Sequence, residues 1–301
     1  MSRNLLAADS PAFIVLNHEA SIDKIGNATT AYTTTNLGRT VGVSFRPANP
    51  PQPSGFVLHF PGLDDGAPDK NIVEIDKHRI IATHRDVALL QLSVCNPVIR
   101  RMDDFAHEHF VYFAASTGQR PSLYLIPEWP DCILDIGGGY SAIFSDGYKR
   151  FNIVALRPRL SYKSQEHQYE VCLFSSETGT WTKQPMKLQP PAKEEELWKS
   201  EVRRHVPSKV ITLEAGTVCW VDLSCGILFS NNLFPWASNQ EIRYVPLPKT
   251  MLRTKRSFSD TASSFRDISG YHGNKIRFVH VENNITYALL YALLEEYVCR
   301  K

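Results

Sequence analysis

Short runs of β-branched and aromatic residues, separated by polar breaks, dominate the hydrophobic pattern of this chain. The runs Val87–Val94 and Phe110–Phe113 are typical of β-strands in their length and residue types. Asp146 and Gly147 lie between two further runs of this kind, and this dipeptide is the strongest short signal of a β-hairpin. The pattern therefore predicts an all-β fold.

The runs group into repeating units that end in the same way. Three units close on a short strand that ends at or just before a proline, namely Pro127, Pro185 and Pro246. Pro185 lies 185 − 127 = 58 positions after Pro127, and Pro246 lies 246 − 185 = 61 positions after Pro185. This spacing is somewhat longer than the roughly 50 residues of a kelch-type propeller blade, and inserted loops account for the excess. We expect blade-like units near residues 72–127, 137–188 and 210–248, and a partial unit at 265–283.

Several predicted strands are apolar at every position instead of at alternate positions. Cys219–Val221 and Ile227–Phe229 are two such runs. Strands of this kind are buried on both faces, and neighbouring blades around a propeller axis provide that burial. A two-layer β-sandwich is the competing all-β interpretation.

Two segments break the strand pattern. Residues 190–204 are polar, with glutamates preceding lysine and arginine, which favours a small exposed helix. Within residues 284–299, apolar residues recur every four positions, at Ile285, Leu289, Leu293 and Tyr297, which predicts a terminal helix. The expected fold is therefore all-β, with β-propeller-like repeated antiparallel blades in a ring that need not close. We expect a short insert helix, a C-terminal helix and a single domain over residues 1–301.

Composition and charge narrow the classes of function. With 43% hydrophobic and 21% charged residues, the chain is typical of folded globular proteins. Lys and Arg number 33 against 31 Asp and Glu, so a net charge of +2 creates no overall attraction to nucleic acid or to an anionic membrane. No apolar run approaches the ~20 residues of a membrane span. The N-terminus also lacks the apolar region of a signal peptide.

The six cysteines contain no C-x-x-C pair. Three of them, Cys95, Cys172 and Cys219, lie in apolar strand-like runs, where buried free thiols are expected. Free thiols belong in a reducing compartment, so we expect a cytoplasmic or nuclear protein.

Histidines supply the few metal-like patterns in the sequence. His107, Glu108 and His109 would place two imidazoles on one side of a strand, but two nitrogens without a third ligand pattern are a weak metal signal. We interpret these residues as a solvated turn before a strand. His78 and His84 flank a short apolar run and are assigned to surface or hairpin positions.

Two glycine-containing patterns resemble catalytic motifs but lack their structural context. Gly137–Gly139 suggest a phosphate loop, yet such a loop needs a helix behind it, and the residues that follow are strand-like. Ser141 lies in a near match to a nucleophile elbow, which lacks the second glycine and the helix. We therefore predict no catalytic residue, no cofactor and no metal, in a protein that is not an enzyme.

The loops carry the remaining candidates. The densest basic run comprises Lys249, Arg253, Lys255 and Arg256. Phosphorylation of Ser257 would place negative charge beside these arginines, although a solvated loop is the plain alternative. Trp198 and Trp236 are the best candidates for an exposed recognition surface, unless each caps the edge of the core. The loops at 230–241 and 249–265 are the first places to look for function.

A resemblance to a known family rests on six strings, Ser93–Pro97, Phe110–Ala114, Cys219–Leu223, Gly226–Phe229, Arg243–Pro248 and Arg266–Ile268. Together they resemble the domain of unknown function 1618, a plant family that is expanded in grasses and has no assigned activity. The run Tyr169–Trp181 is similar to the strand-turn-Trp signature of F-box-associated propeller domains. No F-box fits within residues 1–9, so a ubiquitin-ligase adaptor role does not follow from the resemblance.

These observations favour a non-catalytic interaction module that presents loops to a protein partner, with neither nucleic acid nor membrane as partner. Two alternatives stay open. One is a substrate-receptor-like component of a ubiquitin ligase without its own F-box, and the other is a hydrolase-type enzyme with its site in a central propeller channel.

Overall fold

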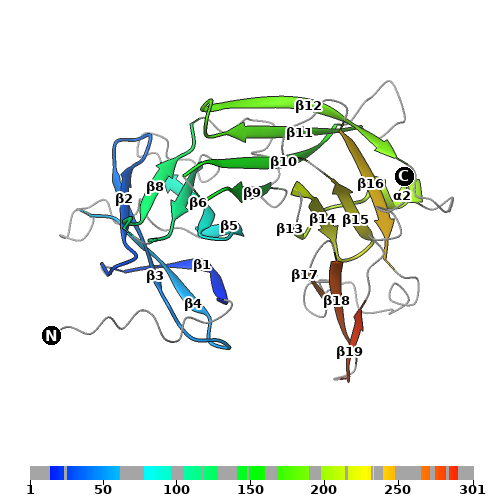
Figure 1. The fold of residues 1–301 in the computed structure, drawn as a ribbon, viewed down its shortest axis with the longest axis horizontal. Helices are drawn as coiled ribbons and strands as arrows, with labels where there is room; N and C mark the ends of the chain where they lie inside the picture. The colour runs from blue at the N-terminus through cyan, green and yellow to red at the C-terminus, as the bar shows by residue number, and fades with distance from the viewer. Residues whose placement is uncertain are drawn as a thin grey trace. The chain divides into compact units, whose positions relative to one another are not determined.

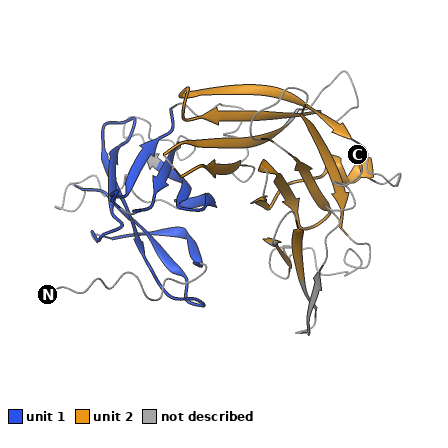
Figure 2. Cartoon of the chain, in the orientation of Figure 1, with its two compact units in different colours: residues 1–129 blue, residues 130–301 orange. Residues whose placement is uncertain are grey.

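The computed structural model describes the chain as a β protein (Figure 1), which confirms the all-β class. The described residues are 14–23, 26–61, 78–95, 105–116, 118–127, 141–147, 149–159, 168–189, 198–213, 216–231, 233, 240–247, 266–271, 275–282 and 285–290. The chain divides into two compact units, residues 1–129 and 130–301 (Figure 2). Each unit contains its own buried hydrophobic cluster. A single propeller domain over residues 1–301 is not confirmed.

Unit 1 contains an eight-stranded sheet in the order β2-β3-β4-β1-β5-β6-β7-β8. Its strands are β1 (Leu16–Ile22), β2 (Ala31–Thr34), β3 (Thr40–Arg46), β4 (Ser54–His59), β5 (Arg79–His84), β6 (Val87–Cys95), β7 (Phe105–Phe113) and β8 (Ser122–Leu125). β1 and β4 are parallel, and the other neighbours are antiparallel. The outermost strands β2 and β8 approach each other, so the sheet is nearly closed and barrel-like.

Alternation along the strands fills the interior of unit 1 with apolar side chains. Leu90 on β6 lies opposite Phe110 on β7, and both are fully buried. The ring of Phe45 on β3 stacks on Phe56 and lies 4.8 Å, between centroids, from the ring of Tyr112. An eight-stranded barrel is just wide enough to be filled by side chains, as it is here.

Unit 2 contains a second eight-stranded sheet in the order β13-β14-β15-β16-β12-β11-β10-β9. Its strands are β9 (Ser141–Ser145), β10 (Phe151–Arg159), β11 (Gln168–Ser175), β12 (Thr180–Gln189), β13 (Lys209–Thr212), β14 (Val218–Asp222), β15 (Gly226–Ser230) and β16 (Glu241–Pro246). β12 and β16 pair in parallel, and the outermost strands β9 and β13 approach each other. This sheet is therefore also barrel-like. A short helix, α2 (Trp198–Arg203), joins β12 to β13.

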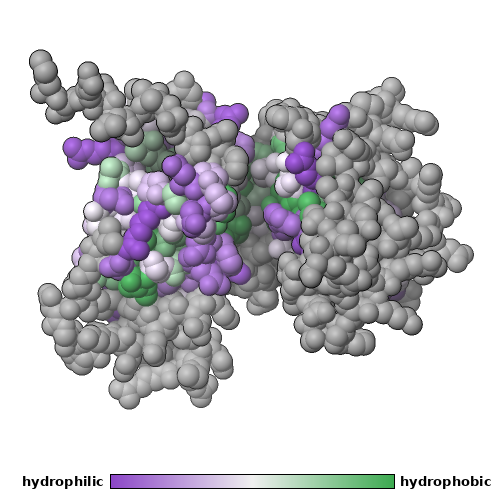
Figure 3. All heavy atoms as spheres, turned by 90° about the horizontal axis from the view of Figure 1, so that it is seen from below, coloured by the Kyte–Doolittle hydropathy of each residue, from purple (hydrophilic) through white to green (hydrophobic). Residues whose placement is uncertain are grey.

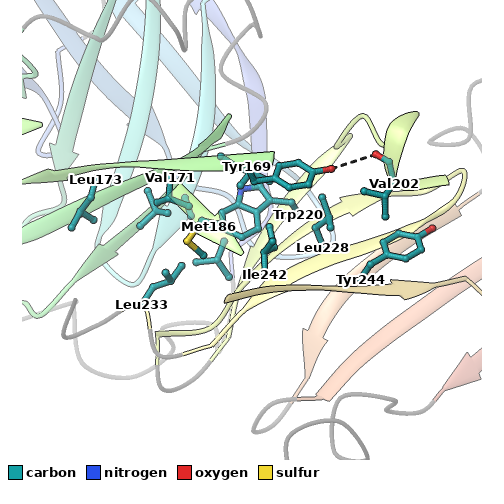
Figure 4. Close-up of a cluster of buried hydrophobic side chains, with 14 residues drawn as sticks. Tyr169, Val171, Leu173, Met186, Val202, Trp220, Leu228, Leu233, Ile242 and Tyr244 are labelled. Atoms are coloured by element: carbon teal, nitrogen blue, oxygen red, sulfur yellow. Dashed lines mark hydrogen bonds between the residues drawn. The ribbon is translucent and has the colours of Figure 1, made fainter. Parts of the chain in front are cut away.

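The interior of this second sheet is organised around Trp220, which is fully buried. Figure 4 shows its indole among Met186, Leu228 and Ile242, which come from three other strands. The helix α2 contributes Val202 to the same cluster, and its backbone carbonyl accepts a hydrogen bond of 3.3 Å from Tyr169 Oη. The predicted insert helix is thus present, but it covers part of the core.

A three-stranded sheet covers the outward face of β13–β16. It consists of β17 (Arg266–Tyr271), β18 (Lys275–Glu282) and β19 (Ile285–Leu290). Ile268 and Phe278 from this sheet share a buried cluster with Val221 and Phe229. Lys209 Nζ and Asp267 Oδ1 form an ion pair of 2.7 Å between the two sheets.

The propeller arrangement is not confirmed. The predicted blades at 137–188 and 210–248 correspond to β9–β12 and β13–β16, but the parallel pair β12–β16 joins them into one sheet. The predicted blade at 72–127 contains β5–β8, which continue the sheet of β1–β4. The predicted units therefore correspond to runs of consecutive strands. These runs join into two eight-stranded sheets instead of forming separate blades.

The predicted terminal helix at 284–299 is wrong where the structure describes it, because residues 285–290 form β19 and pair with β18. The apolar pattern recurs every four positions, and such an even spacing fits one face of a strand as well as one face of a helix. Residues 291–299 lie outside the described residues. Within the described part of the chain, no helix is long and apolar enough to cross a membrane.

Candidate functional site

A cavity of about 450 Å³ lies at one end of the barrel-like sheet of unit 1. It is bounded by the beginnings of β1, β4 and β6 and by the ends of β3, β5 and β7, which the strand pairing brings to the same end of the sheet. The residues that line it are Ile14, Leu16, Thr29, Phe45, Pro47, Ser54, Thr83, Arg85, Asp86, Val87, Ala88, Tyr112 and Ala114. Its volume lies within the range of about 300–1,000 Å³ that is usual for ligand pockets.

Hydrogen bonds to the backbone fix the walls of this pocket. Tyr112 Oη donates to the carbonyl of Thr29 over 2.7 Å, and burial raises the pKa of Tyr112 to about 12, so the phenol remains a donor. The backbone N–H of Phe45 donates to Thr29 Oγ1 over 2.8 Å. The N–H of Ala48 donates to Ser54 Oγ over 3.0 Å. These hydroxyls are engaged by the protein itself, so the inner surface is preformed and mostly apolar.

The rim of the pocket carries two adjacent charges of opposite sign. Arg85 and Asp86 form the two-residue turn between β5 and β6, and Arg85 has a φ of 54°. A left-handed backbone is costly for any residue with a Cβ, by roughly 1–2 kcal/mol. The N–H of Ala114 donates to the carbonyl of Asp86 over 2.8 Å, which ties the turn to the chain after β7. Neither charged side chain forms an ion pair with any residue that the structure describes.

Buried polar side chains form a second group, toward the opposite end of β5–β7 and on the outward face of the sheet. The backbone N–H of Ser93 donates to His78 Nδ1 over 3.2 Å, and Ser93 Oγ is hydrogen-bonded to His107 Nδ1 at 3.1 Å. Gln91 and His109 are opposite each other on β6 and β7, and Arg79 Nε donates to Gln91 Oε1 over 2.9 Å. This group crosses three strands.

Burial keeps the imidazoles of His78 and His109 neutral. Burial, as the larger cause, and the neighbouring His107 together lower the pKa of His78 to about 4. Burial lowers the pKa of His109 to about 3, with His107 and Arg79 adding to the effect. On the inward face of β7, burial raises the pKa of Glu108, whose Oε1 accepts the backbone N–H of Asn36 over 2.9 Å. The hydrogen bonds of this group link β5, β6 and β7 to one another.

The structure corrects two assignments made from sequence. His107, Glu108 and His109 lie inside β7 and do not form a solvated turn, and His78 is buried, not on the surface. His84 ends β5 at a hairpin, as expected. The two imidazoles of β7 do share a face, yet among the described residues no group of three or more His, Cys, Asp or Glu side chains is arranged to hold a metal ion.

A third polar group lies in unit 2, where α2 meets β14–β16. Tyr244 Oη lies 3.0 Å from both Glu201 Oε2 and the carbonyl oxygen of Cys225. Burial is the main cause that raises the pKa values of Tyr244 and of the Cys225 thiol, so both stay protonated. A protonated, half-buried thiol is a poor nucleophile, and this arrangement anchors the helix to the sheet.

Asp222 completes the anchoring. Its Oδ1 accepts the N–H of Ser224 over 2.7 Å and its Oδ2 accepts the N–H of Val206 over 2.9 Å. His205 Nε2 lies 3.2 Å from the carbonyl of Gly226, and burial lowers the pKa of this imidazole although Asp222 opposes the shift. In the sequence, Asp222 lacks a paired acid, base or metal ligand nearby. In the structure its partners are the backbone N–H groups of Ser224, two residues on, and of Val206, which follows the insert helix.

Gly226 faces the ring of Tyr244 at close range. A Cβ at this position would lie 2.5–2.6 Å from Tyr244 Oη, Cε2 and Cζ. We expect Gly226→Ala to lower the free energy of unfolding of unit 2 by about 1–3 kcal/mol, because the hydrogen-bonded ring cannot move away. Chemical denaturation followed by circular dichroism measures the change. Gly55→Ala is the control, since its Cβ would meet Arg46 Cβ at an ordinary 3.6 Å, and equal losses in both variants would contradict the account.

The remaining sequence candidates are dispersed. Ser141 is buried in β9. Trp198 is the first residue of α2, is half-buried and packs against the cluster that contains Trp220. Cys172 and Cys219 are buried free thiols, as expected. The other candidates lie outside the described residues, namely Gly137–Gly139, Trp236, Lys249, Arg253, Lys255, Arg256 and Ser257. The pocket itself carries no sequence motif, because its residues are scattered over about a hundred positions in unit 1.

Comparison with known proteins finds one family that matches the last strands of unit 2. A family of proteins of unknown function, DUF1618, matches residues 220–291. The match extends from β14 to just past β19 and supports the resemblance carried by Gly226–Phe229, Arg243–Pro248 and Arg266–Ile268. It does not extend to the F-box-associated signature at Tyr169–Trp181. No curated protein and no solved structure matches this chain.

Proposed function

We propose that this protein is a non-catalytic protein-interaction module that binds a segment of a partner protein in the pocket of unit 1. The supporting observation is the pocket itself, which has fixed walls, a mostly apolar lining and two charges at its rim. Apolar pockets with a few well-placed polar groups are the usual form of a recognition site. We also propose a cytoplasmic or nuclear location, with neither nucleic acid nor membrane as the partner.

The apolar lining continues onto the exposed surface. Ile14, the first described residue, is 58% exposed and lines the pocket, and Pro47 is exposed beside it. On the face shown in Figure 3, hydrophilic and hydrophobic residues of unit 1 alternate over short distances. Non-obligate protein interfaces have this mixed character and concentrate their binding energy in a few apolar anchors.

Replacing Ile14 with aspartate tests the proposal. Because Ile14 is exposed, Ile14→Asp leaves folding intact while it places a charge on the apolar wall. We expect partner binding to fall at least tenfold, as measured by quantitative affinity capture with mass spectrometry. Ile22→Asp is the matched control, because Ile22 at the end of β1 is 52% exposed and does not line the pocket.

The comparison between the two variants decides the outcome. Partners that bind the unmodified protein and Ile22→Asp but not Ile14→Asp support the pocket as the binding site. Partners retained equally by both variants, or the absence of any reproducible partner, would refute it.

A further inference from the structure

We infer that the pocket of unit 1 selects a partner segment in which one large apolar side chain is flanked by an acidic and a basic residue. This inference rests on the proposed function and specifies the chemistry of the segment that the pocket accepts. Its two elements are the apolar chamber and the charged rim of the pocket.

The chamber accepts an apolar side chain. Its floor is formed by the rings of Phe45 and Tyr112, and Val87 and Ala88 add aliphatic surface. The hydroxyl of Tyr112 is already bonded to the backbone, so a polar side chain entering the chamber would lose its hydration without finding a free partner there. An aliphatic or aromatic side chain meets no such cost and gains by leaving water.

The rim accepts charges of both signs. Arg85 and Asp86 are consecutive residues that both line the pocket, and neither is neutralised by an ion pair within the described part of the chain. A segment with charges of one sign would be attracted by one rim residue and repelled by the other. A segment with one acidic and one basic residue is attracted by both, which is the basis of electrostatic selection at interfaces.

The turn holds these charges in place. A hydrogen bond of 2.8 Å from the Ala114 N–H to the Asp86 carbonyl fixes the turn. The pairing of β5 with β6 continues as far as His84 and Val87, the residues directly before and after the turn. Arg85 keeps an unfavourable φ of 54° within this frame. A strained residue held at a pocket rim suggests a functional role.

A polypeptide is the occupant we favour over a free zwitterion. Ile14 and Pro47 extend the apolar lining onto exposed surface, so an occupant that continues beyond the chamber gains further contact. In an extended segment side chains alternate between two faces, so the residues two positions before and after the inserted side chain, about 6.6 Å along the chain, point the same way and can reach a rim beside the chamber.

Four capped pentapeptides test the inference, namely Glu-Gly-Phe-Gly-Lys, Glu-Gly-Phe-Gly-Glu, Lys-Gly-Phe-Gly-Lys and Glu-Gly-Ala-Gly-Lys, which are named by their three non-glycine residues as Glu-Phe-Lys, Glu-Phe-Glu, Lys-Phe-Lys and Glu-Ala-Lys. Dissociation constants are measured by fluorescence anisotropy on the full chain. We expect Glu-Phe-Lys to bind best, about two- to fivefold better than either single-sign peptide, because exposed charge pairs contribute only modestly to binding. The Ala peptide should not bind measurably. The Glu-Phe-Lys peptide can place its Glu beside Arg85 and its Lys beside Asp86 in one of its two directions. The expected ranking of the four affinities is therefore the same whichever direction the site requires.

Charge reversal at the rim provides the decisive comparison. Arg85→Glu should shift the preference to Lys-Phe-Lys, and Asp86→Lys should shift it to Glu-Phe-Glu, while circular dichroism shows that both variants are folded. An unchanged order in these variants, no binding by any peptide, or equal binding by free phenylalanine would overturn the inference. If the Phe peptides bind irrespective of charge and Ile14→Asp weakens them, the charge selection fails and the proposed function stands. If partner capture is also indifferent to Ile14→Asp, both fail.

Discussion

Replacing Trp220 with alanine is expected to lower the free energy of unfolding of unit 2 by about 3–5 kcal/mol. Trp220 is fully buried in the cluster inside the barrel-like sheet, and the strand that carries it also contributes Cys219 and Val221 to the cluster shared with β17 and β18. The cavity left by the indole would therefore weaken the packing that β14 shares with both cores. Native-state hydrogen exchange measures the change, because the amides of β14 and β15 report the local opening free energy.

Trp181→Ala is the matched control. Trp181 is only half-buried on β12 and packs against Phe174 at 5.3 Å between ring centroids. Its removal deletes a side chain of the same size without opening the interior, so the expected loss is well below that of Trp220→Ala. Equal protection losses in the two variants would show that Trp220 does not organise the core.

Acidification is expected to destabilise unit 1 below about pH 6.5. The folded pKa of His78 is about 4 and that of His109 about 3, both below the ordinary 6.5. Between these pKa values and pH 6.5, the two histidines are protonated in the unfolded chain but not in the folded chain. The stability present above pH 6.5 is therefore lost as the pH falls toward the folded-state pKa values. For His78 alone the loss amounts to roughly 3 kcal/mol by pH 4. Urea denaturation between pH 7 and pH 4 measures it.

Two variants isolate this effect. His78→Asn offers an amide oxygen to the Ser93 N–H but cannot titrate, so the fall in stability between pH 6.5 and 4 should become shallower. His18→Gln, which removes a histidine whose side chain is 72% exposed, is the comparison, and its profile should differ from that of His78→Asn in this pH range. A His78→Asn profile that parallels the unmodified protein would contradict a buried neutral role for His78.

Burial on both faces of the central strands was predictable, whereas its cause was not. Cys219–Val221 and Ile227–Phe229 are apolar at every position, and each run is buried on both faces. One face lies in the barrel-like interior and the other beneath β17–β19. Hydrophobic periodicity reports burial but carries no information about which layer supplies it. Strand pairing distant in sequence, such as β12 with β16, decides between a propeller and a barrel-like sheet.

The candidate site was beyond the reach of sequence patterns for a related reason. The turn at Arg85 and Asp86 lacks the Gly or Asn that usually marks a two-residue hairpin, so no turn signal draws attention to it. Ile14 and Tyr112 reach the same pocket only through the pairing of strands from across unit 1. The histidine pattern at 107–109 was visible, but its burial depends on the neighbouring strands β5 and β6.

Site-specific photo-crosslinking tests the central claim, that the pocket of unit 1 binds a partner protein. A photoreactive amino acid replaces Thr83, an exposed residue that lines the pocket, or Thr34, an exposed residue of β2 that does not. Irradiation in the cells that produce the protein should yield a discrete crosslinked polypeptide from position 83 and none from position 34. No crosslink from position 83, or the same pattern from both positions, would contradict the claim.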